Sequence, residues 1–314
     1  MTDYVVGLLG EGIRRSLTPP MHEREAQHLG LDYEYRVLDL LESGEDPANT
    51  PEIVRRARDE GYAALNVTHP CKQLVIEVLD ELSPEAERLE AVNLVLFRDG
   101  RMIGHNTDWT GFRAALSDGL SDARRELVVQ VGVGGAGAAT SYALLDSGVA
   151  QLVLTDQDVQ RAEAVAAKYR TWFPGRTISV VGSEKLAESL AAADGVLNAT
   201  PMGMDQHPGV SFDIHALGEQ AWVADIVYLP IETELLRTAR AAGHQVLDGG
   251  RMAVGQAADS IRLITGLEPD RARMRAHFLE LLGTPVTSAP AAPPPAAPSP
   301  AVSARATPTT AQLS

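Results

Sequence analysis

The sequence predicts an α/β protein built from two doubly wound α/β domains. Apolar, strand-like runs alternate with helix-like segments along most of the chain, and short connections join them. Repeated βα units of this kind are typical of parallel sheets with helices on both faces. The 314 residues exceed the usual size of a single domain, so two domains are expected. We therefore expect a parallel sheet in each domain.

A glycine-rich stretch at residues 127–156 organises the second domain. It opens with an apolar β-type run, turns through Gly132, Gly134, Gly135 and Gly137, and continues as a helix, after which a second β-type run ends at Asp156. Glycines allow a tight turn and a close approach of the backbone to a pyrophosphate, whose charge meets the free N–H groups at the helix start. An acid at the end of the next strand is typical of ribose binding. The stretch therefore predicts a Rossmann dinucleotide-binding domain.

The remaining elements follow from apolar runs and from their glycine, proline and threonine boundaries. Before residue 127 we expect strands at 4–9, 33–38 and 62–67, helices at 19–28, 50–60 and 109–116, and a hairpin of 92–97 with 101–104. After residue 156 we expect helices at 159–169, 183–192 and 232–242, and strands at 177–181, 195–198, 221–227 and 245–247. Two long helices at 251–265 and 270–282 are expected to return toward the first domain.

The composition of residues 284–314 differs from that of the rest of the chain. Eight of the 19 prolines fall in this segment, among alanine, serine and threonine. Such a segment cannot bury enough apolar surface to offset the conformational entropy that it would lose on ordering. We therefore expect a disordered C-terminal tail.

Charge and cysteine content exclude several kinds of partner. The net charge of −15 argues against nucleic acid, because a phosphate backbone requires a basic surface. The single cysteine, Cys71, excludes an intramolecular disulfide and is expected to be an inert thiol. The sequence shows no signal peptide and no apolar run of about 18 residues that could span a membrane. We expect a cytoplasmic protein without a metal site, since the histidines and the cysteine lack metal-ligand spacing.

Polar residues gather where predicted strands end, which is the edge at which open α/β sheets bind ligands. They are found at residues 16–18, 66–72, 93 and 106–108. Hydroxyls and a lysine would hold a carboxylate, and amides would hold ring hydroxyls. This edge therefore suits a small polyhydroxylated acid.

Eight short motifs, in one order along the chain, resemble the shikimate dehydrogenase family closely. The resemblance covers about residues 5–283. Within the family, Thr18 and the motif at 225–236 are most similar to the quinate/shikimate dehydrogenases of actinobacteria. The motifs are SLTPPMH (16–22), NVTHPCK (66–72), AVN (91–93), NTDWTG (106–111), GVGGAG (132–137), NATPMGM (198–204), DIVYLPIETELL (225–236) and GRMAVGQAA (250–258).

The resemblance implies an oxidoreductase that interconverts quinate with 3-dehydroquinate and shikimate with 3-dehydroshikimate by hydride transfer from a ring alcohol. It implies that Lys72 and Asp108 are the catalytic pair. It also implies a discontinuous substrate-binding domain, residues 1–108 and 250–283, and a cofactor-binding domain, residues 109–249. The implied substrate-binding residues are Ser16, Thr18, Asn66, Thr68, Asn93, Tyr228 and Gln256. The predicted cofactor-binding residues are Gly132, Gly134, Gly135, Ala136, Gly137, Asp156, Thr200, Met202, Val227 and Gly250.

Residue spacing alone leaves other roles open for the catalytic pair. Lys72 would more often be a solvated lysine at a helix start, and Asp108 could cap the helix that follows it. The resemblance favours catalysis at both positions. A lysine accepts a proton only when its pKa falls toward the working pH; burial lowers that pKa, whereas a nearby carboxylate raises it. Asp108 would therefore orient Lys72 and hold a substrate hydroxyl as much as tune the lysine.

The residues after the second strand of the glycine-rich stretch favour NAD over NADP. Asp156 would accept hydrogen bonds from both ribose hydroxyls and would repel a 2′-phosphate. Family members that use NADP carry an Asn-Arg-Thr type of sequence where this chain has TDQD at 155–158. Arg161 is the one basic residue close in sequence that would weaken this preference.

Three alternative functions stay open. The chain could be an aminoshikimate or aminoquinate dehydrogenase of secondary metabolism, an NADP-dependent biosynthetic shikimate dehydrogenase, or a non-catalytic cofactor-binding sensor. The presence of both Lys72 and Asp108 argues against the sensor. For the assembly, we expect a monomer or a homodimer.

Overall fold

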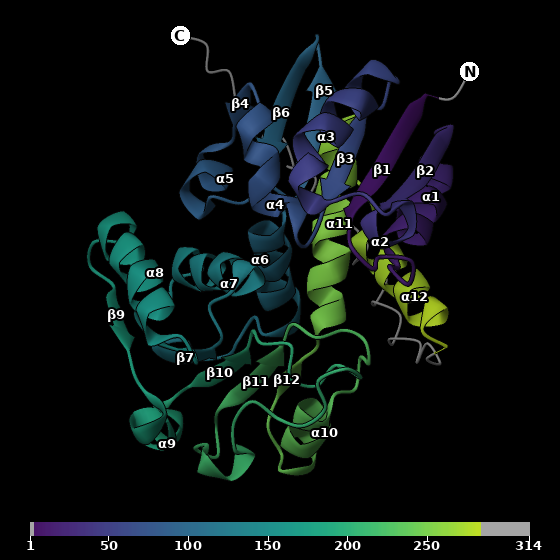
Figure 1. Ribbon diagram of the computed structural model, residues 1–314. Helices are drawn as coiled ribbons and strands as arrows, with labels where there is room; N and C mark the ends of the chain where they lie inside the picture. The colour runs from purple at the N-terminus through teal and green to yellow at the C-terminus, as the bar shows by residue number, and fades with distance from the viewer. Residues whose placement is uncertain (1–2, 284–314) are drawn as a thin grey trace, which may run out of the picture.

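The computed structural model describes residues 3–283, which form two six-stranded sheets joined by long helices (Figure 1). The first sheet lies at the top of Figure 1 and the second at the bottom. The predicted α/β fold with a Rossmann-type sheet is confirmed. The tail predicted at residues 284–314 lies outside the described residues.

The first sheet is mixed, with the strand order β2-β1-β3-β5-β6-β4. Strand β1 pairs in parallel with β2 and β3, whereas β5 is antiparallel to both β3 and β6. The prediction of a parallel sheet is therefore wrong for this half, because the predicted hairpin joins β5 and β6 through two residues, and so short a connection permits only antiparallel pairing. The strands are β1 Tyr4–Gly10, β2 Tyr33–Asp39, β3 Ala64–Val67, β4 Glu81–Leu82, β5 Leu94–Arg98 and β6 Arg101–His105.

The helices of this half begin at residues that favour helix starts. Pro19 lies in the first turn of α1, and the Ser83 hydroxyl accepts a hydrogen bond from Ala86 N–H at the start of α5. The α-helices are α1 Thr18–His28, α2 Leu40–Ser43, α3 Thr50–Asp59, α4 Cys71–Leu74 and α5 Pro84–Leu89, with 3₁₀ turns at Pro47–Asn49 and Val75–Val78.

The second sheet is wholly parallel, with the strand order β12-β11-β10-β7-β8-β9. This order reverses between β7 and β10, which is the point at which doubly wound sheets bind a dinucleotide. The strands are β7 Leu127–Val131, β8 Gln151–Thr155, β9 Thr177–Val180, β10 Gly195–Asn198, β11 Trp222–Asp225 and β12 Val246–Leu247. The helices are α7 Gly135–Asp146, α8 Val159–Trp172, α9 Ser183–Ala192 and α10 Glu234–Ala241, with a 3₁₀ turn at Ile214–Ala216.

Apolar side chains cover both faces of each sheet. In β7, Val128 and Val129 are fully buried and belong to different apolar clusters, because successive side chains of a strand point to opposite faces. In β3, Ala64 and Leu65 are likewise fully buried and belong to different apolar clusters. Among residues 3–283, no helix combines the length and the apolar character needed to cross a membrane.

Two helices, α6 (Asp108–Gly119) and α11 (Gly249–Thr265), connect the sheets. The last helix, α12 (Arg271–Leu281), follows α11. In Figure 1, α6 and α11 run side by side between the two sheets. They cross in backbone contact, since a Cβ atom on Gly111 would lie 2.5 Å from Gln256 N and one on Gly255 would lie 2.7 Å from Gly111 O. The crossing brings residues that follow β6 next to residues of the C-terminal part.

Candidate active site

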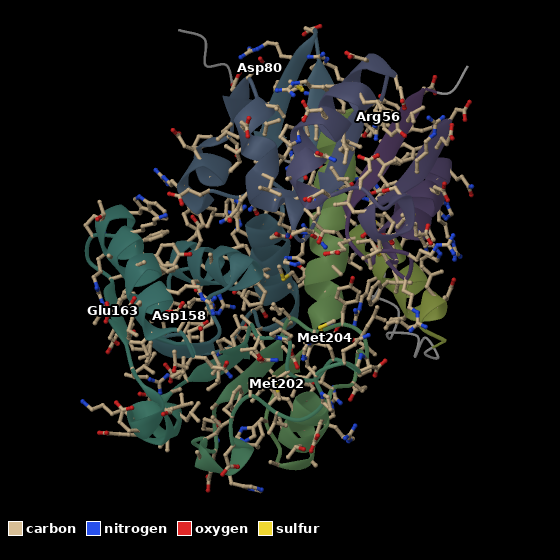
Figure 2. The ribbon with its side chains drawn as sticks, in the orientation of Figure 1. Arg56, Asp80, Asp158, Glu163, Met202 and Met204 are labelled. Carbon is tan, nitrogen blue, oxygen red and sulfur yellow. The ribbon has the colours of Figure 1, made fainter. Side chains whose placement is uncertain are left out.

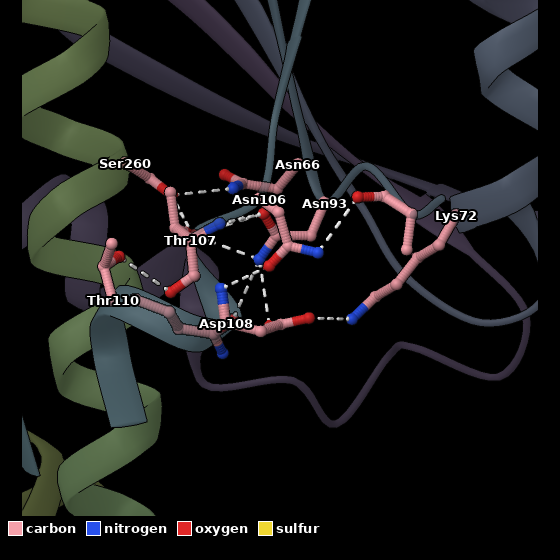
Figure 3. A network of polar contacts seen from close by, with 10 residues as sticks. Asn66, Lys72, Asn93, Asn106, Thr107, Asp108, Thr110 and Ser260 are labelled. Carbon is pink, nitrogen blue, oxygen red and sulfur yellow. Dashed lines mark hydrogen bonds and ion pairs between the residues drawn. The ribbon is translucent and has the colours of Figure 1, made fainter. Parts of the chain in front are cut away.

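Lys72 and Asp108 form a partly buried ion pair at the centre of the site. Lys72 is the second residue of α4, which follows β3, and Asp108 is the first residue of α6, which follows β6. Lys72 Nζ lies 2.6 Å from Asp108 Oδ2, and the two side chains are 21% and 6% exposed (Figure 3). Lys72 is therefore not a freely solvated lysine. Asp108 does not cap α6 with its carboxylate, which bonds Lys72 and Asn93 instead.

Amide side chains hold the carboxylate from its other side. Asn93 Nδ2 donates to Asp108 Oδ1 at 2.9 Å and to Thr107 Oγ1 at 3.0 Å, and Gln256 Oε1 lies 3.4 Å from the same nitrogen. The Thr107 N–H donates to Asn93 Oδ1 at 2.6 Å, which fixes the orientation of the amide. The structure thus brings together four predicted site residues: Lys72, Asp108, Asn93 and Gln256.

Asn66 joins this group through two residues that the sequence did not single out. The Tyr35 hydroxyl donates to Asn66 Oδ1 at 2.8 Å, and Asn66 Nδ2 donates to Ser260 Oγ at 3.1 Å. Ser260 Oγ lies 3.3 Å from Thr107 Oγ1, which completes the network drawn in Figure 3. The signal for Ser260 was a hydroxyl on the otherwise apolar buried face of α11.

The predicted hydroxyl residues lie on two segments that are tied to one another. Ser16 is in the loop after β1 and Thr18 begins α1, whereas Thr68 is in the loop after β3. The Glu11 N–H donates to His69 O at 3.0 Å, and the Thr18 N–H donates to Ser16 Oγ at 3.3 Å. A Cβ atom on Gly10 would lie 2.4 Å from Thr68 Cγ2, so the end of β1 closely approaches the loop after β3. Among residues 3–283 no hydrogen bond joins the hydroxyls of Ser16, Thr18 or Thr68 to Lys72 or Asp108.

Tyr228 lies on the loop that follows β11. Its ring packs against Phe278 of α12 with centroids 6.1 Å apart, and burial raises the pKa of its hydroxyl. The structure places Tyr228 beside the cluster of α1, α11 and α12 rather than in the hydrogen-bond network of Lys72.

The glycine turn is tight at two glycines and open at two others. Gly132 has a φ of +95°, and a Cβ atom on it would lie 2.8 Å from Ala199 O; one on Gly137 would lie 2.5 Å from Gly132 O. A Cβ atom on Gly134 or Gly135 would meet nothing within 4 Å. The open positions lie at the start of α7, with half-buried Ala136 behind them, so the N–H groups of this helix start can receive a pyrophosphate.

Gln130 holds the glycine turn from beneath, although the sequence analysis missed it. Its Nε2 donates to Gly132 O at 2.8 Å and to Gly137 O at 2.7 Å, and its Oε1 accepts from Thr140 Oγ1. The residue is fully buried in β7. The available signal was an amide inside an apolar strand, where a buried polar group needs partners.

Asp156 follows β8 and faces the glycine turn. Its carboxylate accepts from Val133 N–H at 2.8 Å and Asp158 N–H at 2.9 Å, and Arg161 Nη2 lies 2.6 Å away. Burial acts to raise the pKa of Asp156, but these hydrogen bonds and the guanidinium outweigh it and lower the pKa. The group is therefore an ionised acceptor at the place where the sequence predicted ribose binding.

The other predicted cofactor residues lie on three segments. Thr200 and Met202 are in the loop after β10, Val227 is in the loop after β11, and Gly250 is in the first turn of α11. In Figure 2, Met202 is labelled over the second sheet and Met204 near the lower end of α11. A Cβ atom on Gly250 would lie 2.4 Å from Phe278 Cε1, so close packing against α12 already requires a glycine there.

A Rossmann-type sheet with a glycine turn, joined to another sheet whose edge carries a Lys–Asp pair, is typical of two-part oxidoreductases that bind a dinucleotide. The family model for the shikimate dehydrogenase substrate binding domain matches residues 8–95. The chain belongs to the shikimate dehydrogenase family, as its motifs predicted.

Two relatives and one solved structure carry the names of shikimate or quinate dehydrogenases, and these names differ in the cofactor that they state. Shikimate dehydrogenase (NADP(+)) of Pseudarthrobacter chlorophenolicus is 54% identical over 91% of this chain and 98% of its own. Quinate/shikimate dehydrogenase (NAD(+)) of Corynebacterium glutamicum strain R is 46% identical over 90% of this chain and 100% of its own. The structure of quinate dehydrogenase from Corynebacterium glutamicum in complex with NAD has a TM-score of 0.84 at 45% identity, over 89% of this chain and 100% of its own.

Proposed function

We propose that this protein is an NAD-dependent dehydrogenase that interconverts quinate with 3-dehydroquinate and shikimate with 3-dehydroshikimate. The observation that carries the proposal is the contact of 2.6 Å between Lys72 Nζ and Asp108 Oδ2, with amides on its other side. A general base must lie within hydrogen-bond reach of the proton that it takes, and this pair offers a nitrogen and a carboxylate to one hydroxyl.

In the proposed reaction a ring hydroxyl lies against Lys72 and Asp108. Its O–H bond breaks as the carbon loses a hydride, and the proton passes to Lys72 Nζ, which acts as the base once its ammonium has given a proton to solvent. Asp108, held by Asn93, keeps the lysine and the hydroxyl in place. The nicotinamide, when bound, supplies the hydride acceptor. In the reverse direction the Lys72 ammonium returns the proton to the carbonyl oxygen.

Substrate binding is proposed for the polar residues around this pair. The Ser16 and Thr18 hydroxyls, two residues apart where the loop after β1 leads into α1, would bind the carboxylate of the acid. Asn66, Asn93 and Gln256 would hold ring hydroxyls, and Thr68 and Tyr228 would complete the lining. The Tyr35 hydroxyl already donates to Asn66 Oδ1, and Ser260 Oγ accepts one N–H of the Asn66 amide. The second N–H of this amide remains for a ligand.

The proposed domain division follows the two sheets. Strands β1–β6 fall within residues 4–105 and strands β7–β12 within residues 127–247. Helix α11 returns from the second sheet, crosses α6 and contributes Gln256 and Ser260 to the network of the first. These facts support a substrate-binding domain of residues 1–108 and 250–283 and a cofactor-binding domain of residues 109–249.

The preference for NAD rests on Asp156. Its carboxylate is ionised and lies against Val133 of the glycine turn, where it would accept hydrogen bonds from ribose hydroxyls and repel a 2′-phosphate. One observation favours a second candidate, an NADP-dependent shikimate dehydrogenase. The half-exposed Arg161 guanidinium lies 2.6 Å from Asp156 and would receive a 2′-phosphate if it turned away from the acid.

The substitution Lys72→Ala tests the proposed chemistry. It removes the base, so kcat for the oxidation of shikimate and quinate should fall by on the order of 10²-fold or more, with the fold and the Kd for NAD little changed. NADH formation and NAD titration measure the two quantities.

Lys168→Ala is a matched control, because Lys168 Nζ also lies 2.6 Å from a carboxylate, that of Glu90, but on the surface. Its kcat should equal that of the wild type. A Lys72→Ala variant with most of the wild-type kcat would remove Lys72 from the mechanism.

A further inference from the structure

Asp225 is a buried carboxylate for which the proposed reaction has no use. It is the last residue of β11, is 2% exposed, and accepts hydrogen bonds from three groups. The donors are Asn198 Nδ2 at 2.9 Å, Val227 N–H at 3.0 Å and Thr233 Oγ1 at 2.8 Å. Each of these groups donates toward it, so a carboxylate, which only accepts, suits this position better than an amide does.

Asn198 extends the contact into the loop after β10. Its Oδ1 accepts from Thr200 N–H at 3.1 Å and from Thr200 Oγ1 at 2.6 Å, while its Nδ2 donates to Met202 O at 3.0 Å and to Asp225. Asn198 is fully buried. Both N–H groups of this amide are used, and the bond to Asp225 fixes which end of the amide faces Thr200.

Two loops at the carboxyl end of the second sheet therefore depend on one carboxylate. The loop at 199–204 carries Thr200 and Met202, and the loop at 226–232 carries Val227 and Tyr228. Gly203 lies at the same junction, where a Cβ atom would be 3.3 Å from Thr233 Cγ2 and 3.8 Å from Asp225 Oδ2. The loops adjoin the point at which the strand order reverses, where the reactive end of a dinucleotide would reach the first sheet.

We propose that Asp225 is a positioning residue that holds these two loops in the arrangement that binds the nicotinamide end of the cofactor. The inference rests on the proposed function for the identity of the ligand. Asp225 does not touch the reacting atoms; it acts through Asn198 and the Val227 N–H. Loss of the carboxylate would leave three buried donors without an acceptor, and the loops would move to satisfy them.

The test compares Asp225→Ala with the conservative variant Asp225→Asn in the full-length protein. For Asp225→Ala we expect faster amide hydrogen exchange in residues 199–204 and 226–232, a Kd for NAD raised about tenfold, and a kcat lowered on the order of tenfold, the scale of a small misplacement at a reacting centre. The KM for shikimate should change less than twofold. Asp225→Asn keeps an acceptor oxygen for Asn198 and Val227 N–H and should restore most of the NAD affinity.

Asp194→Ala is the matched control at the opposite end of the same sheet. Its carboxylate also accepts from two backbone N–H groups, those of Glu126 and Leu127. This variant should lose stability and keep the wild-type Kd for NAD. An Asp225→Ala protein that is folded, with wild-type exchange in both loops and wild-type NAD affinity, would overturn the inference. If the wild type oxidises neither acid, the proposed function fails, whereas the NAD affinity and exchange comparison still decide the role of Asp225.

Discussion

We propose that the carboxylate of Asp156 selects between NAD and NADP. Replacing it with alanine removes an acceptor for ribose hydroxyls and a charge that repels a 2′-phosphate, and it frees Arg161. For Asp156→Ala we expect kcat/KM for NAD to fall by roughly tenfold or more, the scale of a hydrogen bond to a charged group, and kcat/KM for NADP to rise. Initial rates with each cofactor measure both quantities.

Asp158→Ala is the control for this prediction. Asp158 lies on the same loop, is exposed, and caps α8 by accepting from Arg161 N–H. Its loss should leave the ratio of the two specificity constants unchanged. An unchanged ratio in Asp156→Ala itself would show that this carboxylate does not select the cofactor.

Asp225 also predicts how stability depends on pH. Burial raises its pKa to about 6 from an ordinary 3.8, although hydrogen bonds from Val227 N–H, Thr233 and Asn198 act to lower it. The folded protein thus keeps a proton that the unfolded chain releases, so this group's contribution to stability is lost as the pH rises through about 4 to 6. None of its three hydrogen-bond partners titrates in this range.

Chemical denaturation of the wild type and of Asp225→Asn measures this effect, because asparagine does not titrate. The free energy of unfolding of the wild type minus that of the variant should be about 2 kcal/mol smaller at pH 7 than at pH 4. Two pH profiles that run parallel would contradict the raised pKa.

At the residue scale, the sequence identified the residues around Lys72 more fully than the residues that hold them in place. Lys72, Asp108, Asn93 and Gln256 were identified by motifs that resemble a family, and the structure brings them together. Tyr35 and Ser260 were missed because each supports Asn66 across a long separation in sequence, 31 and 194 residues. A local pattern can mark the Ser260 hydroxyl as buried, but it does not show which residue that hydroxyl contacts.

At the scale of elements, the crossing of α6 and α11 sets the geometry of the site. Gly111→Ala would place a methyl group 2.5 Å from the backbone nitrogen of Gln256, which cannot move alone. We expect the helices to separate, with a loss of about 1–3 kcal/mol in the free energy of unfolding, typical of overpacking. The KM for shikimate should rise, since Gln256 would move away from Asn93.

Gly182→Ala is the control for this substitution. Its added methyl group would meet only the carboxylate end of Glu184, a surface side chain that can rotate away. Unfolding in denaturant and the KM for shikimate should both stay near the wild-type values. If Gly111→Ala behaves in the same way, close contact of the two helices is not what positions Gln256.

Most predicted elements are found within a few residues of their expected ends, because glycine, proline and capping residues give local signals. The Asp99-Gly100 turn and the helix that begins near Val159 are examples. The short helices α2 and α5 and the two-residue strand β4 were not predicted, since segments of two to six residues leave no periodic pattern. Strand order and the antiparallel part of the first sheet depend on pairing between distant segments.

At the scale of the whole molecule, the two sheets carry different parts of the proposed reaction. The second sheet carries Asp156 and the glycine turn, and the first carries Lys72, while α6 and α11 hold the halves together. The glycine motif predicted the second half from local residues. The first half was recognised through motifs spread over the chain, because its polar groups come from α4, from the segment before β5, and from α6 and α11.

The most direct test is a set of initial rates for the wild-type protein with quinate and with shikimate, each with NAD and with NADP. We expect both acids to be oxidised with NAD. We also expect kcat/KM for NAD to exceed that for NADP by about tenfold or more, because the buried carboxylate of Asp156 would accept a hydrogen bond from a ribose hydroxyl and repel a phosphate. A higher specificity constant with NADP would contradict the role given to Asp156. Oxidation of neither acid with either cofactor would contradict the central claim itself.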